Sequence, residues 1–411
     1  MGLIVQKFGG TSLADPDKIH RAARRAIRAK LEGRQVVVVV SAMGHTTDHL
    51  VDLAYAITDR PSRREMDQLL ATGEQVSIAL MAMAIHHAGH DAISLTGGQV
   101  GLRTDRVFGR ARIREITQRG RILSLLREGS IVIVAGFQGV DESANVTTLG
   151  RGGSDTTAVA LAASLGADEC EIYTDVDGVY SADPRIVPEA RKLDCICYDE
   201  MLELASLGAQ VMHSRSIELG KTYGVKIHVR SSYTDAKGTD IVNETPDLEH
   251  VLIRGAALKR NLARVDLIRI PHTPGIAGAI FSRIADRGVV VDDIIQLIHQ
   301  DGDAADLSFT VEGHDLDAAR AVLAELDREI PQMRAAVHTG FSKVSVVGVG
   351  MRTHTGVAAR MFEALKQARV NIENVSTSEI VISCVVRDED GERALRAVHA
   401  AFELDQPTPE K

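Results

Sequence analysis

The sequence predicts an α/β/α sandwich with a mainly parallel central sheet, followed by two smaller α+β modules. Two observations support this fold class. Over roughly the first 245 residues, short β-branched runs alternate with longer helical patterns, which is typical of βαβ units. In the last third of the chain, a pattern of strand, glycine turn, amphipathic helix and strand occurs twice. With 411 residues, the chain is long enough for two or three such domains.

The first part of the chain contains four runs that predict strands and four patterns that predict helices. The strand runs at 36–40 and 131–137 are continuous apolar stretches, as expected for parallel strands buried on both faces. A polar segment with Pro and Gly at 231–249 indicates the end of the domain and a linker. The predicted strands are 36–40, 131–137, 171–174 and 226–229, and the predicted helices are 17–32, 62–88, 156–165 and 199–208.

The last third of the chain repeats internally. The segment T-P-G-I-A-G-A-I-F-S-R-I at 273–284 aligns with H-T-G-V-A-A-R-M-F-E-A-L at 354–365, at a constant offset of 81. The alignment pairs Gly275 with Gly356, and the strand-like segments downstream continue it. Because such a repeat is hard to obtain by chance, two copies of one α+β module are expected here.

The composition narrows the class of protein. The net charge is −9 and Trp is absent, which argues against a nucleic-acid surface built on basic patches and aromatic platforms. No apolar run approaches the ~18 residues of a membrane span, and the N-terminus lacks the features of a signal peptide. The four cysteines form no C-x-x-C pair and the fifteen histidines no H-E-x-x-H, so neither a disulfide framework nor a protein-bound metal is expected. We therefore expect a cytoplasmic protein that binds neither nucleic acid nor membrane.

Three loops of the first domain suit anions, although each also has a plainer interpretation. In K-F-G-G-T-S at 7–12, two glycines, a helix start and Lys7 can meet phosphate; the alternative is a simple turn with a surface lysine. R-G-G-S-D at 151–155 precedes a helix expected from Thr156, with Ser154 as candidate N-cap; the alternative is an ordinary cap beside a solvent-facing Arg. T-D-V-D-G-V-Y-S-A-D-P-R at 174–185 follows a strand, where open α/β sheets bind ligands; the alternative is a polar loop.

Two other glycine motifs do not fit known phosphate loops. G-K-T at 220–222 would need a glycine at Arg215 to form a P-loop, and G-V-G-M-R-T at 348–353 has Thr353 where a dinucleotide fingerprint needs glycine. Three anion-friendly loops without a Walker motif indicate phosphoryl transfer by another fold. A carboxylate acceptor, with pKa ~4, is an anionic nucleophile without help from a base. What it requires is positive charge to offset repulsion from the triphosphate, supplied by cations, Mg²⁺ and helix N-termini.

Taken together, the motifs resemble the aspartokinases of the amino acid kinase family, and the resemblance covers nearly the whole chain. The two repeats resemble the ACT regulatory modules of that family, which are ferredoxin-like βαββαβ units. The motifs that carry the resemblance are K-F-G-G-T-S (7–12), V-S-A-M-G-x-T-T-D (40–48), G-E (73–74), T-L-G-R-G-G-S-D-T-T-A (148–158) and T-D-V-D-G-V-Y-x-A-D-P-R (174–185).

The resemblance implies ATP- and Mg²⁺-dependent phosphorylation of the β-carboxylate of L-aspartate to 4-phospho-L-aspartate, the first step of the diaminopimelate route to lysine, threonine and methionine. It implies that Lys7, Asp155 and Glu74 are catalytic, with Glu74 holding the substrate amine and Arg151 the substrate carboxylate. The implied substrate-binding residues are Ser41, Thr47, Glu74, Arg151, Gly152, Gly153 and Ser154. The implied ATP-binding residues are Lys7, Phe8, Gly9, Gly10, Ser41, Thr174, Asp175, Tyr180, Asp183, Arg185, Gln210 and Val211.

The resemblance also implies an amino-acid effector, lysine or threonine or both, bound at the ACT modules. The implied effector-binding residues are His272, Gly275, Ala277, Asp292, Gln296, Asn371 and Ile372. Two departures from the family pattern bear on these roles. Gln210 stands where many relatives have a nucleotide-binding Lys, and His272 stands where the family usually has Asp facing the effector amine.

The predicted domains are the catalytic domain at 1–245, a linker and strand at 246–262, a first ACT module at 263–340 and a second at 341–411. Because ACT modules generally pair between chains, a homodimer or larger oligomer is expected. Two other functions compete with aspartate phosphorylation: a sibling kinase for glutamate or N-acetylglutamate, and an amino-acid sensor with an inactive kinase-like domain. The four polar residues that an inactive domain would be expected to lose are all present, namely Lys7, Glu74, Arg151 and Asp155.

Overall fold

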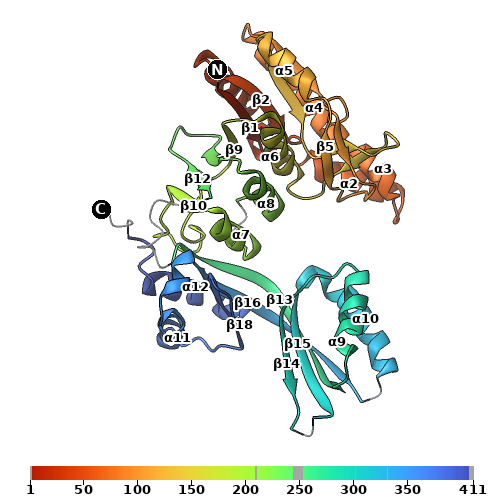
Figure 1. Cartoon of the computed structure of the whole chain (residues 1–411), viewed down its shortest axis with the longest axis vertical. Helices are drawn as coiled ribbons and strands as arrows, with labels where there is room; N and C mark the ends of the chain where they lie inside the picture. Colours follow the sequence, from red (N-terminus) through yellow and green to blue (C-terminus); the bar gives the residue numbers. More distant parts are fainter. Residues whose placement is uncertain (1, 209–210, 244–252, 301, 331, 407–411) are drawn as a thin grey trace. The chain divides into compact units, whose positions relative to one another are not determined.

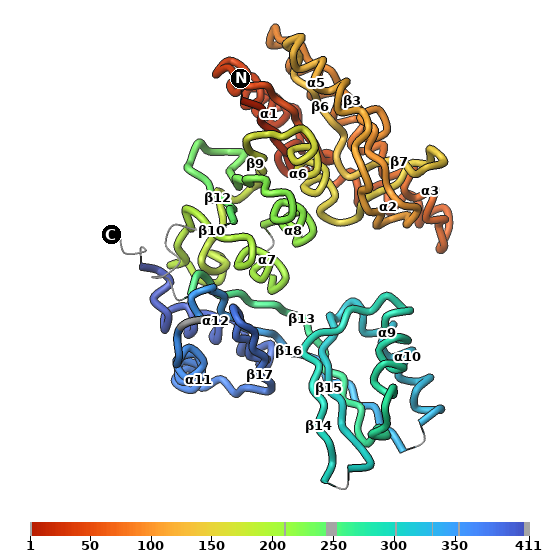
Figure 2. Tube along the Cα trace, viewed as in Figure 1, coloured from red at the N-terminus to blue at the C-terminus, as the bar shows by residue number. Residues whose placement is uncertain are grey.

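The computed structural model describes residues 2–208, 211–243, 253–300, 302–330 and 332–406. Figure 1 shows the elements of the chain and Figure 2 its trace. The chain divides into two compact units. The first comprises 1–180, 192–206 and 210–248, and the second comprises 181–191, 207–209 and 249–411.

The first unit is built on an eight-stranded sheet in the order β10-β12-β11-β9-β1-β2-β6-β3. Its pairings are parallel except for β11 with β12, which confirms the predicted, mainly parallel central sheet. The strand β2 reads Q-V-V-V-V-V, and its five valines are fully buried because helices cover both faces. The strands are β1 (Leu3–Phe8), β2 (Gln35–Val40), β3 (Ala92–Leu95), β6 (Ile131–Ala135), β9 (Glu169–Thr174), β10 (Cys195–Cys197), β11 (Ile227–Ser231) and β12 (Thr239–Val242).

Helices lie on both faces of this sheet. The core on one face joins β1, β2 and β6 to α1 and α4, while α5 and α6 contact the opposite face. The start of α1 follows from sequence, because the Asp15 side chain accepts from the N–H of Lys18 and Pro16 occupies the first helical position. The helices are α1 (Pro16–Leu31), α2 (Thr46–Ile57), α3 (Arg63–Leu70), α4 (Thr72–His87), α5 (Arg119–Arg127), α6 (Gly153–Leu165), α7 (Tyr198–Ser206) and α8 (Ser214–Tyr223).

A second, four-stranded sheet in the order β5-β4-β7-β8 completes the first unit. Its strands are β4 (Leu102–Thr104), β5 (Ile113–Ile116), β7 (Gln138–Val140) and β8 (Val146–Thr148). Asp67 on α3 is fully buried and fixes this sheet, since its carboxylate accepts from the N–H and hydroxyl of Thr148 and from the N–H of Gly109. The sheet therefore holds the chain immediately before the glycine loop at 150–153.

Two helix predictions need correction. The single helix expected at 62–88 is divided into α3 and α4 at Ala71, whose carbonyl accepts from the side-chain amide of Gln138 at 2.8 Å. The helix expected from Thr156 begins at Gly153, and its N-cap is Gly152 rather than Ser154. Gly152 has φ +70°, a conformation that glycine adopts without the steric cost of a side chain, so the chain can enter the helix three residues early.

By length and composition alone, the helical stretch Arg63–His87 is apolar enough to cross a membrane. Half of its most apolar window is buried inside the unit, and Met81 and Ile85 pack in the core beneath the central sheet. We therefore interpret α4 as a core helix.

The second unit contains one six-stranded sheet in the order β14-β15-β13-β16-β18-β17. Two of its strands are long and pair with each other from Gly255 opposite Val347 to Ile268 opposite Arg334. The ladder is irregular near Asn261, which has φ +58°, and Gly340 nearby has φ +82°. The strands are β13 (Gly255–Pro271), β14 (Val291–Ile298), β15 (Ala304–Glu312), β16 (Arg334–Val347), β17 (Asn374–Thr377) and β18 (Val381–Arg387).

The sequence repeat appears as two equivalent turns into helices. Gly275 and Gly356 are the N-caps of α9 and α11, with φ +94° and +91°, so the aligned glycines share one left-handed conformation. The helices of this unit are α9 (Ile276–Asp286), α10 (Leu316–Glu329), α11 (Val357–Gln367) and α12 (Gly391–Ala401). The boundaries proposed at 263 and 341 stay predictions; both fall inside long strands that run through both modules.

Candidate active site

A cavity of about 320 Å³ lies at the carboxyl ends of β1, β2 and β6. This is the edge at which open α/β sheets bind ligands. Its walls come from segments far apart in the sequence, and all seven residues predicted to bind substrate are among them. The lining residues are Lys7, Gly10, Ser41, Ala42, Gly44, Thr47, Glu74, Phe137, Gly150, Arg151, Gly152, Gly153, Ser154 and Asp155.

Lys7 and Asp155 form an ion pair in this cavity. The Nζ atom of Lys7, at the end of β1, lies 2.6 Å from Oδ1 of Asp155, in the first turn of α6. Both side chains are only about one tenth exposed, at 11% and 12%. Because a helix N-terminus carries partial positive charge, α6 adds to the positive field of Lys7 at this point. The pair therefore places a cation and a carboxylate at the wall of a cavity that can admit an anion.

Glu74 presents a buried carboxylate to the same cavity. It lies in the first turn of α4, is 3% exposed, and its Oε1 accepts from the N–H of Ala42 at 3.0 Å. Its Oε2 is buried and has no hydrogen-bond partner among the described residues. Burial raises the pKa of this carboxyl from 4.5 to about 7, against the opposing effect of the Ala42 N–H. A ligand ammonium group would supply the missing partner and favour the ionised form.

The glycine loop at 150–153 is held by side chains that the sequence did not single out as functional. The Arg215 guanidinium donates to the carbonyl of Leu149 at 2.9 Å and to that of Ala111 at 2.8 Å. The side chain of His213, at the N-cap of α8, fills the space in which a Cβ on Gly152 would lie. Only the tertiary fold identifies these two positioning residues, because α8 is separated from the loop by some sixty residues of sequence.

We expect Gly152→Ala to lower both the activity and the stability of the protein. The added Cβ would overlap His213, and alanine would be strained at φ +70°. The matched control is Gly166→Ala at the other end of α6, where φ is +68° and an added Cβ would have no described atom within 4 Å. Thermal unfolding should show a loss of about 1 kcal/mol for the control and a larger loss for Gly152→Ala. Equal losses, with activity intact, would contradict the assigned packing.

The residues predicted to bind nucleotide are not brought together in this cavity as a set. Of that set, Lys7, Gly10 and Ser41 line it. Phe8 is buried and stacks on Tyr173, and the N–H of Gly9 donates to the carbonyl of Tyr173 at 3.3 Å. A Cβ at Gly10 would lie 2.8 Å from the carbonyl oxygen of Ala42, so the close approach of the two loops requires glycine.

The remaining nucleotide candidates divide between the two units. Thr174, at the end of β9, donates from its hydroxyl to the Asp175 carboxylate at 3.0 Å. Tyr180 donates to Asp177 at 2.7 Å, a residue of the same motif that the predicted set omitted. In the second unit, the Arg185 guanidinium pairs with Asp183 at 2.7 Å. Val211 is half-buried, and Gln210 lies outside the described residues.

The predicted effector residues lie in or beside the first module and just before β17 of the second module. His272 has its Nδ1 3.1 Å from the carbonyl oxygen of Gly302, and Asp292 forms an ion pair with the buried Lys343. Gly275 is the N-cap of α9 and Ala277 lies within that helix. Gln296 is exposed on the edge strand β14, and Asn371 and Ile372, which precede β17, are exposed.

A cavity of about 510 Å³ occurs in the second module, and none of these seven described residues lines it. Its walls include Gly356 and Ala358, which the repeat aligns with Gly275 and Ala277. The repeat offset is therefore the sequence signal that could have identified them. The lining residues are Met351, His354, Gly356, Val357, Ala358, Thr377, Ser378, Glu379 and Ile382.

The open parallel sheet, the cavity at its carboxyl edge and the lysine–carboxylate pair fit an α/β protein of the phosphotransferase class. Comparison with known proteins agrees with this class. The model of the amino acid kinase family matches residues 2–231, and a model of the ACT domain matches residues 344–402.

The full chain also has close relatives. It is 51% identical over 404 residues to aspartokinase 2 of Bacillus subtilis, covering 98% of each sequence. It is 27% identical to E. coli aspartokinase III crystallised with aspartate and ADP in the R-state, with a TM-score of 0.83, covering 97% of this chain and 99% of that one. The T-state crystal structure of the same enzyme with lysine and aspartate gives a TM-score of 0.77 at 27% identity, with the same coverage. The chain therefore belongs to the amino acid kinase family and, within it, to the aspartokinases.

Proposed function

We propose that this chain transfers the γ-phosphoryl group of ATP to the β-carboxylate of L-aspartate, giving 4-phospho-L-aspartate. This reaction is the first step of the route to lysine, threonine and methionine. The observation that supports it best is the convergence of all seven predicted substrate residues on one cavity beside the Lys7–Asp155 pair. The similarity to an aspartokinase crystallised with aspartate and ADP points the same way.

The cavity suggests a role for each charged residue. The aspartate ammonium would pair with Oε2 of Glu74, which is buried and lacks a partner among the described residues. The α-carboxylate of the substrate would pair with the guanidinium of Arg151, which is exposed on the cavity wall. The β-carboxylate is then directed toward Lys7, whose charge offsets the repulsion between nucleophile and phosphate. No general base is required, because the β-carboxylate is ionised at neutral pH.

The donor set of the cavity fits Mg²⁺ bound mainly through ATP. Magnesium in kinases is usually held by one or two carboxylates together with substrate phosphates and water. Asp155 supplies such a carboxylate, and the part of the chain that the structure describes holds no cluster of three or more His, Cys, Asp or Glu residues that could form a separate metal cage. When bound, the ion would neutralise charge on the transferring phosphoryl group.

The decisive experiment traps the product. The full chain is incubated with ATP, Mg²⁺ and aspartate in the presence of hydroxylamine, which converts an acyl phosphate into a coloured hydroxamate. We expect hydroxamate from aspartate and little from glutamate or N-acetylglutamate. Hydroxamate from glutamate alone would favour a related kinase that phosphorylates glutamate. If no acidic amino acid gave hydroxamate, the kinase function would be excluded in favour of an amino-acid sensor.

Arg151→Gln is expected to raise the KM for aspartate more than it lowers kcat. The reason is that an ion pair with the substrate carboxylate is made in the ground state and in the transition state alike. Loss of one charge-assisted contact predicts an increase of about tenfold to a hundredfold in KM. Arg110→Gln, which removes a nearby guanidinium from outside the cavity lining, is the control. An unchanged KM in Arg151→Gln would exclude this role.

We further propose that an amino-acid end product, lysine or threonine or both, regulates the enzyme through the two ACT modules. The relative crystallised in its T-state contains lysine, which supports this class of effector. In the hydroxamate assay, added lysine or threonine should lower the rate. His272 stands where the family usually has Asp, so the identity of the effector has to be determined by that measurement.

We also propose that the chain forms a homodimer or larger oligomer through its ACT modules. The edge strand β14 exposes Ile294, Leu297 and Ile298, at 52%, 65% and 58%. An exposed apolar edge strand presents unpaired backbone groups to a second copy. Leu297→Lys with Ile298→Lys should shift the mass measured by light scattering toward the monomer. Val375→Lys, on the opposite edge strand β17, is the matched control. An unchanged mass in both variants would exclude β14 as the contact.

Cytoplasmic location remains a prediction.

A further inference from the structure

The first unit contains a second cavity, of about 390 Å³, with charged walls. It is formed by β1, β9, β11 and α1, on the face of the sheet that carries Gln6 rather than Lys7. The residues of this charged cavity are Ile4, Gln6, Arg25, Arg28, Ala29, Glu32, Arg34, Glu169, Glu171, Tyr173, Lys226, His228, Arg230 and Asp235. None of them has a role in the proposed reaction.

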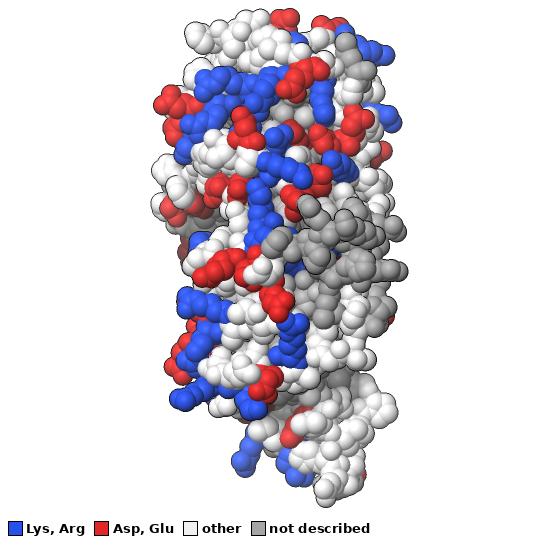
Figure 3. Space-filling model, turned by 90° about the vertical axis from the view of Figure 1, so that its left-hand side faces the viewer, with Lys and Arg blue, Asp and Glu red and all other residues white. Residues whose placement is uncertain are grey.

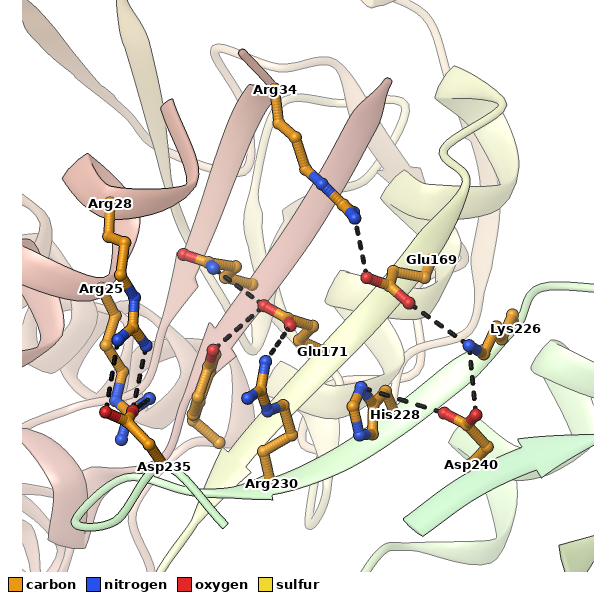
Figure 4. Close-up of polar contacts among 12 residues, drawn as sticks. Arg25, Arg28, Arg34, Glu169, Glu171, Lys226, His228, Arg230, Asp235 and Asp240 are labelled. Atoms are coloured by element: carbon orange, nitrogen blue, oxygen red, sulfur yellow. Dashed lines mark hydrogen bonds and ion pairs between the residues drawn. The ribbon is translucent and has the colours of Figure 1, made fainter. Parts of the chain in front are cut away.

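Most of the charges in this cavity are already paired. Figure 4 shows Glu169 between Arg34 and Lys226, with N–O distances of 3.0 and 3.5 Å. It also shows Arg230 directed at Glu171, at 2.7 Å, and Asp235 between two arginines of α1. Ion pairs alone do not mark a site, because charges of both signs are interspersed over the face drawn in Figure 3.

Three buried side-chain atoms of residues that line the cavity nevertheless have no hydrogen-bond partner in the described part of the chain. They are Oε1 of Gln6 and the Nε atoms of Arg25 and Arg230. Gln6 is 2% exposed and Arg25 is 8% exposed, so water does not reach them freely. The Gln6 amide is oriented by its own NH₂ group, which donates to Glu171 at 2.8 Å and leaves the carbonyl oxygen as acceptor. Buried groups of this kind carry a free-energy cost unless something supplies the missing bonds.

The three unpartnered atoms specify the chemistry of a ligand. Two guanidinium N–H groups require an acceptor such as a carboxylate, and one amide oxygen requires a donor such as an ammonium group. The lining holds five Lys and Arg residues and four Asp and Glu residues, a formal balance of 5 − 4 = +1. A nearly balanced site favours a ligand with both charges over a multiply charged anion such as phosphate.

We propose that this charged cavity is a second amino-acid binding site, separate from the catalytic cavity. The ligand carboxylate contacts Arg25 and Arg230, and its ammonium group contacts Gln6. The site is connected to the catalytic loop through the backbone, because Gln6 precedes Lys7 on β1 and the Tyr173 carbonyl accepts from Gly9. The proposal does not depend on the identity of the phosphorylated substrate.

In the test, the full chain is titrated with each standard amino acid and with inorganic phosphate, and binding is measured by calorimetry. Two variants probe the site: Gln6→Met removes the acceptor, and Arg230→Lys removes the Nε–H while keeping a cation beside Glu171. We expect at least one amino acid whose Kd rises about tenfold or more in both, as the loss of a hydrogen bond to a charged group predicts. Three controls should bind it as the wild type does: Arg24→Met on the exposed side of α1, Glu74→Gln in the catalytic cavity, and His272→Ala in the first ACT module.

A second measurement guards against misfolded variants. In protein labelled with ¹⁵N-arginine, the Nε–H signals of Arg25 and Arg230 should shift when that amino acid is added. The proposal would be overturned if no amino acid showed binding that depends on Gln6 or Arg230, or if neither signal shifted on saturation. Binding of phosphate in place of every amino acid would also overturn it, because that outcome assigns the cavity to an anion.

Discussion

Lys7→Met is expected to lower the rate of phosphoryl transfer to aspartate on the order of 10³-fold. The nucleophile and the triphosphate are both anions, so the reaction depends on positive charge at the point where they meet. Lys7 is the buried cation of the cavity, at the end of β1 and 2.6 Å from Asp155. The hydroxamate assay at saturating ATP and aspartate measures the effect. A kcat within tenfold of the wild type would refute the role.

The same substitution has a structural effect that must be separated from the catalytic one. Removing Lys7 leaves Asp155 as a nearly buried carboxylate without its cation, which costs about 3 kcal/mol in other proteins. The double variant Lys7→Met with Asp155→Asn removes both charges and should recover most of that stability while remaining inactive. Lys30→Met, on α1 and outside the cavity lining, should retain activity and stability. If the double variant were as unstable as the single one, the loss of activity would have to be attributed to unfolding.

Glu74→Gln is expected to abolish tight aspartate binding while stabilising the protein without ligand. Gln can still accept from the Ala42 N–H, but it no longer attracts the substrate ammonium. The KM for aspartate should therefore rise about a hundredfold, because a buried charge-assisted contact is lost. In the wild type, this KM should fall as the pH rises through about 7, where the Glu74 carboxyl ionises. The variant should lose that dependence.

The stability effect of Glu74→Gln has a defined pH window. The folded-state pKa of about 7 lies above the ordinary value of 4.5, so the folded protein holds the proton more tightly than the unfolded chain does. The contribution of the Glu74 carboxyl to the free energy of unfolding is therefore greatest below about pH 4.5, and it falls as the pH rises toward 7. Above pH 7 the cost amounts to about 3 kcal/mol at most. Glu74→Gln should raise the unfolding temperature at pH 8 and leave it nearly unchanged at pH 4. Glu65→Gln, on the exposed side of α3, should change neither, and a similar rise in that control would contradict the burial argument.

Much of the fold is encoded in local patterns that a single sequence reveals. The valine run of β2 predicted a parallel strand buried on both faces, and the helical pattern at 17–32 placed the start of α1 within one residue of its first residue, Pro16. The aligned glycines Gly275 and Gly356 predicted two equivalent helix entries, which share one backbone conformation. These features could be read because side-chain periodicity and glycine conformation act within a few residues.

The candidate residues of the catalytic cavity were also identified from sequence, through loops at the ends of predicted parallel strands and through a family resemblance. Their convergence on one cavity was not visible in the sequence, because the residues come from segments more than a hundred positions apart. The hydrogen-bond partner of each residue was not visible in the sequence either. The Ala42 N–H that holds Glu74 and the Arg215 guanidinium that holds the glycine loop are contacts of the folded chain.

The sequence by itself identified four strands and, in outline, four helical stretches of the first unit, the repeat in the second unit and the set of chemical groups available for catalysis. Only the tertiary structure decided which groups meet and which of the described ones remain unpaired. It moved the start of α6 to Gly153, buried the Glu74 carboxylate enough to raise its pKa to about 7, and left Gln6 with an unpartnered oxygen in a charged cavity. The physical reason is that burial and pairing depend on neighbours in space, which the order of residues along the chain does not specify.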